Sequence, residues 1–123
     1  MLLKGDIMFA LNFQSPHHEK LLIARTKNCT VRLGDVRNIY PENSVVWITV
    51  GKRMGPKRKL YAASVDRTKT KRFSQLTMED LQHQNPDIDS VEALLRFFES
   101  IYNKALTMED LVTVIYFSEI TEA

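Results

Sequence analysis

The stretch Arg25-Thr26-Lys27-Asn28-Cys29-Thr30-Val31-Arg32 (residues 25–32) carries the strongest structural signal in the sequence. Apolar side chains at Cys29, Val31 and Leu33 alternate with polar ones from Asn28 to Arg32. Successive side chains of a β-strand point to opposite faces, so the alternation predicts a short strand over residues 28–33 with its polar groups on one face.

The preceding residues predict a strand followed by a helix. Ile7, Phe9, Leu11 and Phe13 stand at every second position, which is typical of a strand over residues 7–13 with one buried face. Ser15-Pro16 is a helix start signal, because the serine oxygen can accept from a backbone amide and proline suits the first helical turn. A helix over residues 16–25 then leads into the stretch quoted above.

The following residues predict a hairpin, two helical segments and a closing strand. Residues 45–50 and 60–65 are rich in β-branched and aromatic residues, and the basic connection between them contains turn-forming glycines. Thr77 with Asp80 predicts a capping box for a short helical turn, and Asp89 with Glu92 predicts a second one for a longer helix up to about residue 102. Residues 111–120 predict the last strand.

The hexapeptide Leu-Thr-Met-Glu-Asp-Leu occurs twice, at residues 76–81 and 106–111. Its flanking sequences differ between the two copies, so it indicates similar turn chemistry and not a duplicated unit. The 123 residues, 44% of them hydrophobic, fit a single domain over residues 1–123. The order of elements predicts an α+β fold in which a curled, mostly antiparallel sheet is covered by two main helices.

The stretch at residues 25–32, followed by Gly34-Asp35, resembles the Lys-x-x-Thr-x-Arg signature of ASCH domains. The order of the remaining elements is similar as well and extends the resemblance over nearly the whole chain. It implies a small PUA-like β-barrel of about five to six mostly antiparallel strands, flanked by two main helices and short helical turns. Lys27, Thr30 and Arg32 are then expected to line the floor of a cleft.

The resemblance also implies function. ASCH domains are generally taken to bind RNA, and one bacterial branch hydrolyses the amide of N4-acetylcytidine with the motif threonine as nucleophile and the motif lysine as its activator. Thr30 and Lys27 would be the corresponding catalytic residues here. Gln84 stands at the apparent position of that branch's glutamate, where Asp80 is the nearest alternative carboxylate. For a bound ligand, Gln84 and Asn85 are further candidate contacts through their amide groups.

Charge is strongly segregated along the chain. Residues 1–51 carry six Lys/Arg and four Asp/Glu, residues 52–72 carry nine Lys/Arg and only Asp66, and residues 73–123 carry two Lys/Arg and ten Asp/Glu. The overall formal charge of +2 therefore conceals a central basic segment beside an acidic one. A basic segment attracts phosphates, so nucleic acid is expected to meet one side of the molecule. A solvated loop is the alternative interpretation.

The basic segment supplies the candidate contacts to an RNA backbone, on two stretches expected to flank one cleft. They are Lys52, Arg53, Lys57, Arg58, Lys59, Arg67, Lys69, Lys71 and Arg72. Four aromatic residues near these stretches are candidates either for stacking on bases or for the core: Tyr40, Trp47, Tyr61 and Phe73.

Three functions remain open from the sequence. The first is a noncatalytic domain that binds RNA or a nucleotide. The second is a hydrolase of an acylated or modified nucleoside, for which Lys27 needs a pKa lowered by burial or by a nearby charge such as Arg25 or Arg32. The third is a ribonuclease in which Lys27 and Arg32 stabilise the phosphate transition state.

Several sites are not expected. Cys29 is the only cysteine, and His17, His18 and His83 lack ligand spacing, so we predict neither a metal site nor a cofactor. No segment approaches the roughly 20 apolar residues of a membrane span, and nothing resembles a cleaved leader. We therefore expect a cytoplasmic protein whose partner is RNA or a nucleotide-like molecule, with its oligomeric state left open.

Overall fold

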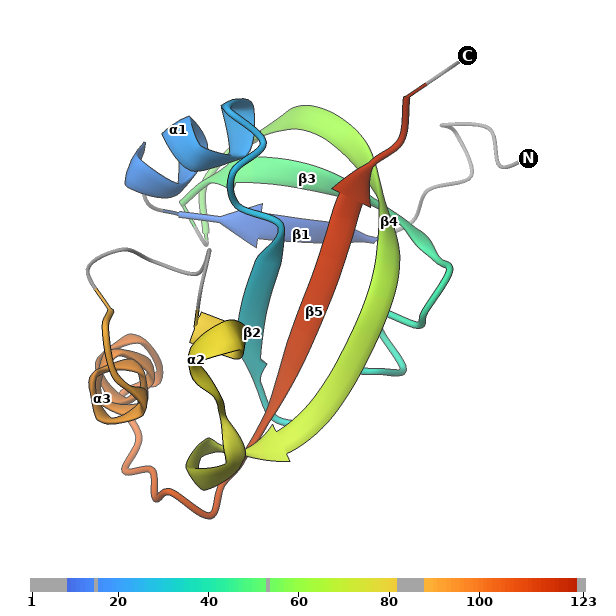
Figure 1. The fold of residues 1–123 in the computed structure, drawn as a ribbon. Helices are drawn as coiled ribbons and strands as arrows, with labels where there is room; N and C mark the ends of the chain where they lie inside the picture. The colour runs from blue at the N-terminus through green and yellow to red at the C-terminus, as the bar shows by residue number, and fades with distance from the viewer. Residues whose placement is uncertain (1–8, 15, 53, 82–87, 122–123) are drawn as a thin grey trace.

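A curled sheet of five strands, in the order β1-β3-β4-β5-β2, forms the centre of the part of the chain that the structure describes (Figure 1). This computed structural model describes residues 9–14, 16–52, 54–81 and 88–121. Only β1 and β3 pair in parallel among the described strands. The predicted α+β class with a small, barrel-like sheet is confirmed. Its elements are β1 (Ala10–Phe13), α1 (Pro16–Ile23), β2 (Cys29–Leu33), β3 (Val45–Gly51), β4 (Lys57–Arg72), the 3-10 turn η2 (Phe73–Gln75), α2 (Met78–Leu81), α3 (Val91–Tyr102) and β5 (Leu111–Glu119).

The long strand β4 turns the sheet. It pairs with β3 along its first half and with β5 along its second, and its register to β5 shifts between Val65 and Arg67. Such an irregularity bends a strand and increases its twist, so β4 carries the sheet around from β3 to β5 (Figure 1). The sequence predicts only residues 60–65 as strand. The structure extends it to residue 72, because Lys69 and Lys71 continue the alternation opposite Val114 and Val112 of β5.

Two hydrophobic clusters pack on the two faces of the sheet. On β5, Ile115 and Phe117 belong to the cluster inside the curl, whereas Val112 and Val114 belong to the cluster beneath α3. The same alternation divides β2, where Cys29 and Val31 lie under the helix and Thr30 lies on the opposite face. The predicted polar face of residues 28–33 is therefore turned toward the interior of the curl, and Thr30 is buried there with 1% of its surface exposed.

The helix ends differ in part from the prediction, and Ser15, the cap predicted for the first helix, lies outside the described residues. Helix α1 ends at Ile23, earlier than predicted, and the chain reverses at Arg25, whose φ of 61° lies in the left-handed region. Helix α3 begins after Ser90, whose side chain accepts a hydrogen bond of 3.1 Å from the Ala93 amide, so Ser90 replaces the predicted cap Asp89. Within the described residues, no helix combines the length and apolar character needed to cross a membrane.

Candidate ligand-binding cleft

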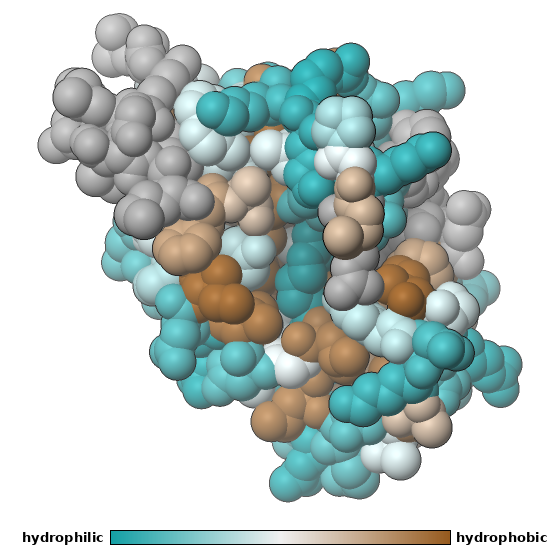
Figure 2. Space-filling view, turned by 180° about the vertical axis from the view of Figure 1, so that it is seen from behind, coloured by the Kyte–Doolittle hydropathy of each residue, from teal (hydrophilic) through white to brown (hydrophobic). Residues whose placement is uncertain are grey.

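A cavity of about 520 Å³ opens where the two edge strands of the sheet, β1 and β2, approach each other. Helix α3 forms its outer wall. Seen from behind the view of Figure 1, the surface is hollowed near its centre, with hydrophobic side chains around the hollow and hydrophilic ones at the periphery (Figure 2). The cavity is lined from β1 and α1 by Asn12, Phe13, Gln14 and His18, from β2 by Thr30 and Arg32, from α3 by Phe97, Phe98, Ile101 and Tyr102, and also by Tyr40 and Lys57.

Arg32 connects the two edge strands across the floor of this cleft. One guanidinium nitrogen donates to Thr30 Oγ1 at 2.6 Å, and another donates to the Asn12 carbonyl of β1 at 3.0 Å. The guanidinium carbon also lies 5.0 Å from the centre of the Phe13 ring. Burial lowers the pKa of Arg32, but an arginine keeps its charge in a folded protein. The floor of the cleft therefore carries a fixed positive charge held in one orientation.

Lys27 is not among the residues that line the cleft, contrary to the prediction: it is buried beside the floor, with 1% of its surface exposed, and borders a separate hollow with Arg25 and Tyr61. Its Nζ donates to the Cys29 carbonyl at 2.9 Å, which places the amine beside the peptide bond that joins Cys29 to Thr30. Burial first, and the charge of Arg32 second, lower the pKa of Lys27 to about 7. The amine also lies 5.3 Å from the centre of the Phe13 ring. Near neutral pH, the charged and uncharged forms of Lys27 are therefore both populated.

Arg25, the other cation considered for lowering the pKa of Lys27, is engaged elsewhere. Its guanidinium makes two hydrogen bonds of 2.9 and 2.8 Å to the carboxylate of Glu119 and lies 4.1 Å from the centre of the Tyr61 ring. It fastens the end of β5 to the turn before β2.

Phe97, Phe98, Ile101 and Tyr102 of α3 line one side of the cleft and form what we call its aromatic wall. The sequence does not predict a function for these residues. Phe97, Ile101 and Tyr102 are each between 37% and 38% exposed, although they belong to the strongly amphipathic helix α3. Helical periodicity assigns such residues to a core, because it cannot show that part of the apolar stripe passes beyond the sheet edge. Of the four aromatic candidates from the sequence, Tyr40 lines the cleft, while Phe73 and Tyr61 are buried.

The basic candidates lie on different parts of the molecule. Lys57 lines the cleft, Arg58 forms an ion pair with Glu19 of α1, and Lys59 lies 4.6 Å from the centre of the Trp47 ring. Lys52 and Arg72 are exposed as well. The Nε atom of Arg72 lies 3.5 Å from a carboxylate oxygen of Glu109.

The second basic stretch follows β4 along the side of Tyr116 and α2. The guanidinium carbon of Arg67 and the amine of Lys69 lie 4.5 and 5.7 Å from the centre of the Tyr116 ring, and Lys71 donates to Asp80 at 2.5 Å. Their role as RNA contacts stays a prediction. Arg53, Gln84 and Asn85 lie outside the described residues, so the structure does not place these candidates.

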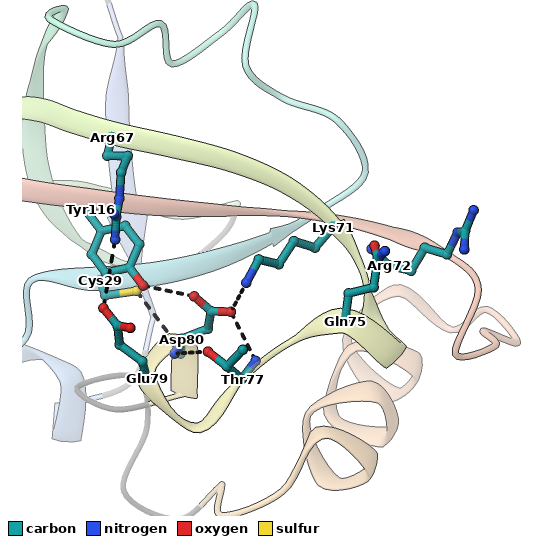
Figure 3. A network of polar contacts seen from close by, with 9 residues as sticks. All are labelled: Cys29, Arg67, Lys71, Arg72, Gln75, Thr77, Glu79, Asp80 and Tyr116. Carbon is teal, nitrogen blue, oxygen red and sulfur yellow. Dashed lines mark hydrogen bonds and ion pairs between the residues drawn. The ribbon is translucent and has the colours of Figure 1, made fainter.

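Asp80, the alternative carboxylate, is held in a polar network (Figure 3) and is not among the residues that line the cleft. Its carboxylate accepts from Lys71 at 2.5 Å, from the Thr77 amide at 3.0 Å and from the Tyr116 hydroxyl at 2.9 Å. Burial opposes ionisation, but these three donors outweigh it and lower the pKa of Asp80. The Asp80 amide in turn donates to Thr77 Oγ1 at 3.3 Å, which completes the predicted capping box. Cys29 donates from its thiol to the Asp80 carbonyl at 3.6 Å, and burial raises the pKa of that thiol to about 11.

The cleft combines an apolar wall with a small set of convergent polar groups, which is typical of a small-molecule or nucleobase site. Arg32 and Lys57 offer donors to carbonyl or phosphate oxygens, and Thr30 places a hydroxyl next to Arg32. No group of three or more potential metal ligands is found among the described residues.

Comparison of the sequence with protein-family models and with curated proteins finds no match. Solved structures do match. Protein EF3133 from Enterococcus faecalis is 13% identical with a TM-score of 0.67, over 94% of this chain and 82% of its own. An ASCH domain from Lactobacillus crispatus is 12% identical with a TM-score of 0.63, over 92% and 79%. Hypothetical protein PH0355 is 16% identical with a TM-score of 0.63, over 91% and 98%. The chain therefore has the fold of the ASCH domain, as the signature around Lys27, Thr30 and Arg32 predicts.

Proposed function

We propose that this protein binds single-stranded RNA and takes one unpaired base into the cleft between β1 and β2. The observation that carries the proposal is the pairing of an aromatic wall on α3 with the oriented guanidinium of Arg32 on the floor. Aromatic faces stack on any base, and sequence-specific RNA proteins read the edges of splayed bases by hydrogen bonds. A cavity of about 520 Å³ lies within the usual range for such ligands.

The distribution of charge supports RNA over an uncharged ligand. Lys57 stands at the cleft itself, and Lys52 and Arg58 lie beside it on the β3–β4 hairpin. Phosphate contacts of this kind position an RNA without reading its sequence. The segment after residue 72 is acidic, so the basic hairpin beside the cleft is the natural place for the backbone.

Truncation of the aromatic wall tests this proposal. We expect Phe97→Ala and Tyr102→Ala each to weaken binding of a fluorescent single-stranded oligoribonucleotide about tenfold, because stacking contributes roughly 1 to 3 kcal/mol per base. Both side chains are partly exposed, so the variants should keep the fold, which circular dichroism checks. Fluorescence anisotropy at low salt measures the affinity.

Ile23→Ala is the matched control, since Ile23 is an apolar residue of α1 that is 56% exposed and does not line the cleft. It should bind RNA as the parent does. Absence of RNA affinity at low salt contradicts the proposal. Binding that Phe97→Ala and Tyr102→Ala leave unchanged contradicts the assignment of the base to this cleft.

One observation favours a second candidate, hydrolysis of an acylated nucleoside with Thr30 as nucleophile. The lowered pKa of Lys27, about 7, is what a general base for a threonine hydroxyl requires. In this reaction Lys27 takes the proton of Thr30 Oγ1, the oxygen bonds to the acyl carbon, and the amine of the nucleobase leaves with a proton. Water then releases the acyl group from Thr30.

An assay of N4-acetylcytidine hydrolysis tests this second candidate. We expect Thr30→Ala to lower the rate by about 100-fold or more, and the parent's rate to rise with pH through about 7 as Lys27 loses its proton. Thr26→Ala removes an exposed hydroxyl nearby and should leave the rate unchanged. Equal rates for the parent and Thr30→Ala exclude Thr30 as the nucleophile.

A further inference from the structure

A second hollow, of about 420 Å³, lies between α1 and the hairpin that joins β3 to β4. Its lining residues come from α1 and the connection between β1 and α1, from the ends of β3 and β4, and from the turn between these two strands. They include Gln14, Glu19, Gly51, Lys52, Lys57 and Arg58. Neither the ASCH-like signature nor the cleft accounts for this hollow.

The shape of the hollow depends on Gly51. Its φ of 151° is in the region that favours glycine, and a Cβ atom there would meet the Pro56 carbonyl oxygen at 2.4 Å. Asn12 of β1 donates to the Gly51 carbonyl at 3.0 Å and accepts from Thr49 Oγ1 at 2.8 Å. The hairpin is thereby fastened to the strand that also lines the cleft, so the two cavities keep a fixed relation.

The charge lining the hollow is predominantly positive. Lys52, Lys57 and Arg58 line it, and Glu19 is the one carboxylate among its described lining residues. Glu19 forms an ion pair with Arg58. The two lysines therefore supply positive charge in excess of the acid, on a concave surface where they face the same volume. Oxygens of a phosphate are the usual partners of such groups.

The hollow and the cleft adjoin each other, because Gln14 and Lys57 line both. We propose that the hollow is a phosphate subsite, which holds the phosphate of the nucleotide whose base occupies the cleft. This inference rests on the proposed function and sharpens it. The ligand is a nucleotide and not a nucleoside, and its phosphate points toward the β3–β4 hairpin with Lys57 at the junction.

Calorimetric titration with paired ligands tests the inference. The four ribonucleosides and their 5′- and 3′-monophosphates are compared on the full chain. At least one monophosphate should bind about tenfold tighter than its own nucleoside, since hydrogen bonds to charged groups contribute more than neutral ones. The preferred isomer, 5′ or 3′, reports the direction in which RNA runs through the cleft.

Two variants with opposite expected effects make the test specific. Lys52→Ala should reduce the advantage of the monophosphate to about threefold or less, whereas Glu19→Gln should increase it by releasing Arg58 from its ion pair. Both should leave nucleoside binding unchanged, and Lys104→Ala, which removes an exposed lysine after α3, should change neither. All three residues are at the surface or partly exposed, so folding is preserved.

The outcomes separate this inference from the proposed function. If a nucleoside binds and its monophosphates bind no tighter, the phosphate subsite is wrong and the base site stands. If Lys52→Ala and Lys104→Ala weaken monophosphate binding equally, the effect is general electrostatic attraction, and the subsite is again wrong. If neither nucleosides nor RNA bind, the proposed function itself fails.

Discussion

Replacement of Lys27 by methionine is expected to stabilise the fold near pH 7 and to lose this advantage as the pH rises. Lys27 has 1% of its surface exposed, and its pKa is lowered to about 7 from an ordinary value of 10.5. Methionine has a similar length and no charge to desolvate. The variant gives up the hydrogen bond to the Cys29 carbonyl, which offsets roughly 1 kcal/mol of the gain.

The direction of this pH dependence follows from the number of protons bound by the folded and the unfolded chain. Between the folded pKa of about 7 and the unfolded value, the unfolded chain holds the proton and the folded chain does not. Unfolding therefore takes up a proton, and the contribution of Lys27 to the free energy of unfolding rises by up to about 1.4 kcal/mol per pH unit in this window. Between pH 7 and pH 9 the advantage of Lys27→Met should shrink by about 2 kcal/mol.

Urea denaturation of both proteins at a series of pH values measures this difference. Titrating groups that do not interact with Lys27, such as Tyr116, cancel when the variant is compared with the parent at each pH, whereas Cys29 does not, because burial raises the pKa of its thiol while the charge of Lys27 lowers it. Lys20→Met is the control, because Lys20 is an exposed lysine of α1, and it should give a difference that does not change with pH. A constant difference for Lys27→Met as well contradicts the lowered pKa and with it the base required for hydrolysis.

The location of the candidate site followed from alternation in the sequence, but its chemistry did not. Strand periodicity at residues 28–33 was sufficient to place Thr30 and Arg32 on one face of β2. It gave no information on Lys27, since a residue in the turn before a strand has no periodicity to fix its burial. Its buried surroundings include Phe13 of β1, which is an edge strand far from β2 in the strand order.

The basic segment shows a second limit of local patterns. Charge density singles out residues 52–72 as basic, yet the bend of β4 separates their side chains between the hairpin, Trp47 and the Tyr116 side of the sheet. The pairing of β4 with its neighbouring strands, and not the composition of the segment, determines which of these cations lie close together. The same limit applies to the aromatic wall, because Phe97 and Tyr102 line the cleft only as a result of where α3 crosses the edge of the sheet.

Of the two copies of the hexapeptide, the one that contains Asp80 should contribute more to the free energy of unfolding. We expect Asp80→Asn to lower the free energy of unfolding by about 3 kcal/mol, because it leaves the Lys71 ammonium facing an uncharged amide and disturbs the bond from Tyr116. Asp80 has 1% of its surface exposed, while the Lys71 side chain is 20% exposed, which limits the cost to the lower part of the range for buried pairs.

The second hexapeptide provides the control within the same chain. Asp110 accepts from the Thr107 amide at 2.7 Å, as Asp80 accepts from Thr77 at 3.0 Å, but Asp110 lies in a turn before β5 and is only partly buried. Asp110→Asn should therefore cost about 1 kcal/mol, the usual value of a capping interaction. The excess loss in Asp80→Asn measures what Lys71 and Tyr116 add to the shared turn chemistry.

Acid titration gives an independent check on the same network. Because the pKa of Asp80 is lowered in the folded state, its stabilisation is complete above the ordinary carboxyl pKa and is lost as the pH falls toward the folded value. The difference between the parent and Asp80→Asn should accordingly stay constant near neutral pH and shrink below about pH 4. Equal losses for Asp80→Asn and Asp110→Asn at neutral pH would show that Lys71 and Tyr116 add nothing. Helix α2 would then depend on its capping box alone, and the bonds of Asp80 to Lys71 and Tyr116 would not help to hold α2 against β4 and β5.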